Sequence, residues 1–98
     1  MNQGLTLIRP GSTEAMQLLG QWIVCLLWWG DEDEPVDTCP AQVVGVVVPA
    51  PGGPVKPQLL MNARPWDGPS EGFEYEIFLD TVMHLHVVAP PRDALRLA

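Results

Sequence analysis

Basic residues are scarce in this chain. Its 98 residues include one lysine and four arginines against twelve acidic residues, which gives a formal net charge of −7 at pH 7. Proteins that bind nucleic acids neutralise the phosphate backbone with clustered lysines and arginines, and the sequence has no such cluster. Anionic membrane surfaces also attract polybasic segments. The composition therefore argues against nucleic acid and membrane surfaces as partners, and a partner selected by charge should present a basic protein surface.

The chain also lacks a long apolar run. The best candidate, residues 15–29, contains Gly20 and two glutamines, whereas a membrane-spanning helix needs about 20 predominantly apolar residues. A secretory signal begins with a basic region and ends at small residues. Here Arg9 is the only basic residue before the apolar run, and tryptophans and acids follow that run. We therefore expect a soluble, cytoplasmic protein without a membrane segment.

Cysteine is nearly absent, since the sequence contains only Cys25 and Cys39. Small secreted scaffolds depend on several disulfides, and two cysteines do not indicate such a scaffold. A disulfide between the two would close the acidic segment that separates them. We favour instead a buried, apolar role for Cys25 and a free thiol at Cys39.

Eleven prolines and nine glycines fall between the apolar runs and mark loops. The intervening segments predict a strand at 5–8 and a helix at 13–19 that ends at Gly20. Residues 21–29 are rich in β-favouring types, so we predict a strand there. One continuous helix over 15–29 is the alternative.

Two predicted strands, 21–29 and 42–48, are apolar on both faces. Strands of this kind belong in the middle of a sheet that is covered on both sides. We therefore expect these two strands to be central neighbours, joined by the acidic loop 30–41. A weaker strand is predicted at 58–63.

Residues 73–88 alternate between apolar and polar side chains, with one face apolar throughout. This pattern predicts a hairpin with a three-residue turn at 80–82, or one long bent strand. The hairpin would place Glu76 opposite His86.

Together these segments predict a single α+β domain over 1–98. It would contain a small, mostly antiparallel sheet of about five or six strands and one short N-terminal helix. Residues 89–98 are expected to form a C-terminal tail, either a short helix or a flexible segment.

The acidic residues gather in two zones, 31–37 and 67–80. Trp66 precedes the second zone, and tryptophan is a frequent anchor of protein interfaces. The alternatives are that the acids only keep the chain soluble and that Trp66 covers one end of the core. The residues predicted to bind a partner are Asp31, Glu32, Asp33, Glu34, Asp37, Trp66, Asp67 and Glu71.

The residues His84 and His86 would share one face of a strand, with Glu76 opposite them. Two histidines and a carboxylate form the ligand set of several metal sites, so these three are weak metal candidates. The alternative is an ordinary cross-strand pair. Because no nucleophile motif is present, we predict no enzymatic activity and no cofactor. A metal-dependent enzyme that uses His84 and His86 is a third hypothesis.

The leading hypothesis is a small acidic module that binds a basic surface of another protein. In composition the chain is similar to many short bacteriophage or mobile-element proteins that inhibit host machinery in this way. The second hypothesis is a self-assembling structural subunit of a virion or complex. A homo-oligomer would supply the cover that so short a chain lacks for its apolar strands.

Overall fold

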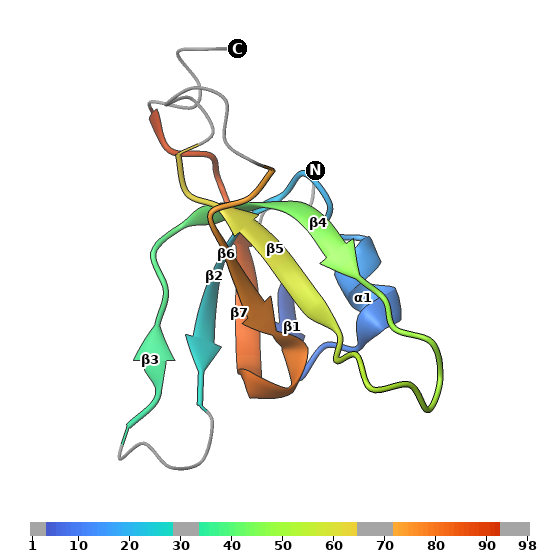
Figure 1. The fold of residues 1–98 in the computed structure, drawn as a ribbon. Coiled ribbons are helices and arrows are strands. Elements are labelled where there is room, and N and C mark those ends of the chain that lie inside the picture. The colour runs from blue at the N-terminus through green and yellow to red at the C-terminus, as the bar shows by residue number, and fades with distance from the viewer. Residues whose placement is uncertain (1–3, 29–33, 65–71, 93–98) are drawn as a thin grey trace.

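The computed structural model describes residues 4–28, 34–64 and 72–92. Within these ranges seven strands form one antiparallel sheet, with one short helix beside it (Figure 1). The elements are β1 (Thr6–Ile8), α1 (Ser12–Met16), β2 (Trp22–Leu27), β3 (Val36–Asp37), β4 (Ala41–Val47), β5 (Gln58–Asn62), β6 (Tyr75–Phe78), the 3₁₀ helix η2 (Leu79–Thr81) and β7 (Val82–Val88). The strand order is β1-β7-β2-β4-β5-β6, and β3 pairs with β2 outside this path.

The structure is predominantly β. The mostly antiparallel sheet is confirmed, but α1 has only five residues and forms no helical layer. The α+β class is therefore not clearly met. The predicted helix 13–19 is shorter than expected because the chain leaves the helix after Met16 and turns at Gly20, whose φ of +83° suits glycine. None of the described helices is long and apolar enough to cross a membrane.

The predicted neighbours β2 and β4 do pair, but only over two residues of each strand. Trp22 lies opposite Gln42 and Ile23 opposite Ala41. The other end of β2 pairs with β3 instead, since Leu26 lies opposite Asp37. The acidic connection 30–41 therefore contains a short strand of its own.

The predicted hairpin within 73–88 is wrong. Strand β6 pairs with β5, whereas β7 pairs with β1 and β2. Three strands, β2, β4 and β5, lie between β6 and β7 in the order of the sheet. In the sequence, however, only the three residues of η2 separate β6 from β7. So short a link requires the sheet to curl on itself. Both strands contribute to the enclosed core, but the buried positions change parity at the corner, from Ile77 and Leu79 to Val82, and change back at Leu85. The unbroken alternation of the sequence therefore did not reveal the corner.

The core lies inside the curled sheet. Strands β2, β4, β5 and β7 supply most of it, and Ala15 and Leu18 cover it from the helical segment with no exposed surface. The largest fully buried side chains are Leu18, Ile23, Val43, Leu59, Met61, Val82 and Leu85. We call the side of the sheet that carries these residues the inner face.

Candidate functional site

A row of residues crosses four strands on the side of the sheet away from the core. In an antiparallel pair, directly opposite residues point to the same face. His84 lies opposite Ile8 on one side and opposite Leu26 on the other. Leu26 in turn lies opposite Asp37. The row is formed by Ile8, His84, Leu26 and Asp37, from β1, β7, β2 and β3.

A second, parallel row contains Thr6, His86 and Val24, since His86 lies opposite both of its neighbours. Alternation along each strand places the two rows on the same face. We call the two rows together the outer face, which consists of Thr6, Ile8, Val24, Leu26, Asp37, His84 and His86.

The outer face is partly apolar and is less covered than the inner face, although Trp22, which continues the same side of β2, is 5% exposed. Ile8 is 76% exposed, and Val24 and Leu26 are half-buried, whereas Cys25 between them is 2% exposed. An isolated exposed apolar residue is ordinary. Here, however, Ile8 continues a row that includes Leu26, and contiguous apolar surface with polar residues at its rim is typical of interaction sites.

Two histidines occupy the middle of the outer face. Their rings lie 5.0 Å apart in an edge-to-face arrangement with an interplanar angle of 61°. The Thr6 hydroxyl and the Nδ1 atom of His86 are 2.7 Å apart and share a hydrogen bond whose direction depends on the histidine tautomer. The Nδ1 atom of His84 is buried and has no hydrogen-bond partner within the described residues. The hydrogen bond with Thr6 therefore fixes His86, whereas His84 has no such contact at its Nδ1 atom in the described part of the chain.

The predicted pairing of Glu76 with His86 is wrong. Glu76 lies on β6 opposite Leu60, whereas His86 lies on β7, because the hairpin that would have joined them does not form. In the part of the chain that the structure describes, no group of three histidine, cysteine or acidic side chains could hold a metal ion. The ligand set expected from the sequence is thus not assembled there.

The first acidic zone meets the outer face through β3. Both Glu34 and Asp37 are exposed, and Asp37 belongs to the outer face itself. Exposed apolar side chains accompany them, since Val36 is 45% exposed and Trp28 at the end of β2 is 41% exposed. The remaining residues predicted to bind a partner lie outside the described residues: Asp31, Glu32, Asp33, Trp66, Asp67 and Glu71.

The two cysteines behave as expected from the sequence. Both thiols are free, Cys25 buried and Cys39 exposed. Burial raises the pKa of the Cys25 thiol to about 12, and a hydrogen bond with Thr38 opposes this only in part. The backbone N–H of Cys25 also donates to the Thr38 hydroxyl at 2.9 Å, which ties β3 to β2. Cys25 is therefore a structural residue and a poor nucleophile.

Sequence reasoning did not select Ile8, Val24 or Leu26 as interaction residues. Ile8 lies in the apolar run 5–8, whereas Val24 and Leu26 lie together in the apolar run that begins at Trp22. Only the register of the strands shows that all three share a face with Asp37. Comparisons with protein-family models, with curated proteins and with solved structures found no significant match to this chain.

Proposed function

We propose that this chain is a protein-binding module that recognises a basic and partly apolar protein surface through its outer face. The row that joins Ile8 and Leu26 to Asp37 is the observation that supports this most strongly. It combines partly exposed apolar surface with a carboxylate at the rim, the arrangement typical of protein interfaces.

The apolar and acidic parts of this surface have different roles. Burial of Ile8 and Leu26 against a partner would supply the affinity, because apolar area removed from water is the main driving force of association. The acids would steer a basic partner toward the face. Among residues 4–28, 34–64 and 72–92 the recorded ion pair joins Lys56 to Asp80, and neither Glu34 nor Asp37 has a basic partner there.

A narrower form of this proposal is an inhibitor from a bacteriophage or mobile element that occupies a basic surface of a host protein. It is supported by composition, since a net charge of −7 on 98 residues favours basic partners. In either form the protein acts by binding and not by catalysis.

The proposal is tested by affinity capture from lysate of the source organism at low and high salt. The wild-type bait is compared with a bait that carries Glu34→Gln and Asp37→Asn. A control bait carries Glu14→Gln and Asp80→Asn, which remove the same charge from exposed acids elsewhere on the chain. Each captured protein is identified and its binding measured again with purified components.

We expect a basic partner whose capture weakens with salt and with the Glu34/Asp37 bait, and is retained by the control bait. If both variant baits retain the partner equally, Glu34 and Asp37 do not contribute to recognition and the acidic part of the proposal is wrong. If a Leu26→Asp bait also captures the partner as well as the wild type does, the outer face is not the binding surface.

Self-assembly is the second candidate function, and the exposure of Ile8 at 76% is the observation that favours it. A second copy of the chain could cover the outer face in a two-fold interface. The mass of the purified chain in solution separates this candidate from binding to a different protein.

A further inference from the structure

A hollow of about 400 Å³ runs along one edge of the sheet. Its lining comprises all four residues of β6 together with Leu27 and Thr81. Successive residues of a strand point to opposite faces. A hollow that touches every residue of β6 must therefore follow the edge of the strand, and no other described strand lies on that side of β6.

The backbone of β6 directs hydrogen-bonding groups into this hollow. The N–H of Leu79 donates to the carbonyl of Pro57 at 3.0 Å, so Leu79 faces β5. In an antiparallel pair the residues that bond to the neighbouring strand alternate with residues whose N–H and C=O point away from it. By this alternation Glu76 and Phe78 direct their backbone groups toward the open edge.

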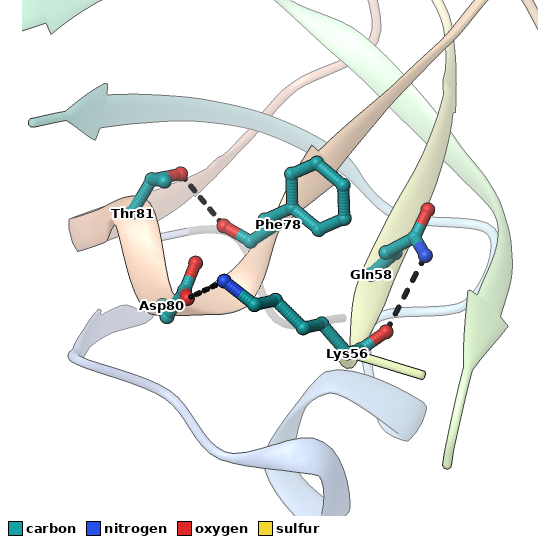
Figure 2. Close-up of polar contacts among 5 residues, drawn as sticks. All are labelled: Lys56, Gln58, Phe78, Asp80 and Thr81. Atoms are coloured by element: carbon teal, nitrogen blue, oxygen red, sulfur yellow. Dashed lines mark hydrogen bonds and ion pairs between the residues drawn. The ribbon is translucent and has the colours of Figure 1, made fainter. Parts of the chain in front are cut away.

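One of these groups is already bonded. The Thr81 hydroxyl donates to the carbonyl of Phe78 at 2.7 Å and closes the end of the strand (Figure 2). The N–H and C=O of Glu76 and the N–H of Phe78 remain directed at the hollow, with the donor and acceptor spacing of a strand edge.

The two sides of the hollow differ in chemistry. Ile77 and Tyr75 line it from the inner face of β6, and Leu27 of β2 lies across from them. On the outer side the Glu76 carboxylate is exposed and has no basic partner in the described part of the chain. Phe78, also on the outer side, is 41% exposed.

From this geometry we propose that β6 binds an extended peptide segment of a basic partner protein as an added strand. The segment alternates apolar and basic residues, with its apolar side chains toward Leu27 and Ile77 and a lysine or arginine beside Glu76. Main-chain hydrogen bonds supply affinity in this mode of recognition, and alternate side chains supply specificity. This edge is separate from the outer face and does not depend on it.

A second copy of the chain suits this edge poorly. Pairing of β6 with a two-fold copy of itself centred on Glu76 would set the two Glu76 carboxylates directly opposite each other. A centre at Ile77 or Phe78 extends the pair to the ends of β6, which are flanked by Glu74 and by Asp80 of η2. Like charges directly opposite each other destabilise a strand pair, whereas a basic peptide replaces each such conflict with an attraction.

The test uses the full chain and the synthetic peptide acetyl-Lys-Val-Lys-Val-Lys-Val-Lys-amide, followed by the backbone amide signals of the protein in nuclear magnetic resonance spectra. A peptide with glutamate in place of lysine is the charge control. We expect the lysine peptide to shift the signals of β6, Leu27 and Thr81 and to slow hydrogen exchange of the Glu76 N–H. Shifts that leave β6 unaffected would overturn the proposal.

Two variants separate the backbone from the charge. Proline is tolerated on edge strands where its missing N–H would face outward, so Glu76→Pro should keep the β5–β6 pairing and weaken peptide binding by about tenfold or more. Glu76→Gln should weaken it about two- to fivefold and reduce its salt dependence. Unchanged binding by a folded Glu76→Pro protein would refute the added strand.

If Glu76→Pro does not fold, the wild-type chain and a peptide N-methylated at its valines answer the same question. Loss of binding of that peptide supports the added strand, and equal binding of both peptides overturns it. Because the Glu34 and Asp37 variants leave β6 intact, failure here and failure of the outer-face proposal are distinguishable.

Discussion

The two faces of β2 have similar apolar content, but their side chains differ in burial toward the end of the strand that pairs with β3. On the inner face Leu85 has no exposed surface and Cys25 is 2% exposed, whereas Leu26 on the outer face is half-buried. Cys25 and Leu85 lie directly opposite each other, and Leu26 follows Cys25 in the chain. The comparison shows that an apolar side chain in a strand does not determine its own burial. Burial depends on which neighbouring elements the fold places over each face.

Matched leucine truncations should give the largest difference between the two faces. Leu85→Ala removes fully buried atoms and should lower the free energy of unfolding by about 2–5 kcal/mol. Leu26→Ala removes atoms that already contact water and should lower it by about 1 kcal/mol or less. Urea unfolding of both variants beside the wild type measures the difference, and equal losses would show that the outer face is covered in solution.

The Cys25 thiol offers a second contrast, in the dependence of stability on pH. Burial raises its pKa from 9.0 to about 12. The folded chain therefore keeps this proton in a pH range where the unfolded chain loses it. The stabilisation is complete below about pH 9 and is lost as the pH rises toward 12, at up to about 1.4 kcal/mol per pH unit.

Urea unfolding between about pH 8 and pH 10.5 tests this linkage. Burial also raises the pKa of Tyr75, which contributes in the same direction and is present in every variant. Cys25→Ala should make the decline shallower, and Cys39→Ala is the matched control because that thiol is exposed. Identical slopes for Cys25→Ala and the wild type would contradict the assigned cause.

The smallest change in the free energy of unfolding is expected from the loss of a polar contact that belongs to neither face. Lys56 and Asp80 form an ion pair at 3.2 Å, with 65% and 55% of their side chains exposed (Figure 2). Exposed ion pairs contribute about 0–1 kcal/mol, so Lys56→Ala should barely change the free energy of unfolding. A loss as large as that of Leu85→Ala would mean that the corner at η2 depends on this pair.

The sequence was sufficient to locate most strands. Residues 22–27, 41–47 and 58–62 form strands close to the predicted ranges, because β-branched and apolar content between proline- and glycine-rich loops acts locally. The partners of β6 and β7 were not predictable in this way. The alternation in 73–88 is equally compatible with a hairpin and with two strands joined at a corner, and only the packing of the whole sheet distinguishes them.

The candidate site could likewise be predicted only in part, because its assembly depends on strand pairing. Asp37 was selected from charge alone, and the structure places it at the surface. Its alignment with Leu26, His84 and Ile8 depends on the register of three strand pairs between segments far apart in the sequence. The free edge of β6 likewise results from the strand order, because residues 75–78 would have been paired on both sides had the hairpin formed.

In the proposed function the outer face is open in the isolated chain and binds a different protein. The most direct measurement is the mass of the purified wild-type chain in solution, by sedimentation velocity at micromolar concentration, beside the Leu26→Asp variant. We expect a monomer of 10.8 kDa in both cases. A wild-type dimer or larger assembly that Leu26→Asp dissociates would contradict it, and would assign the outer face to contacts between copies of this chain.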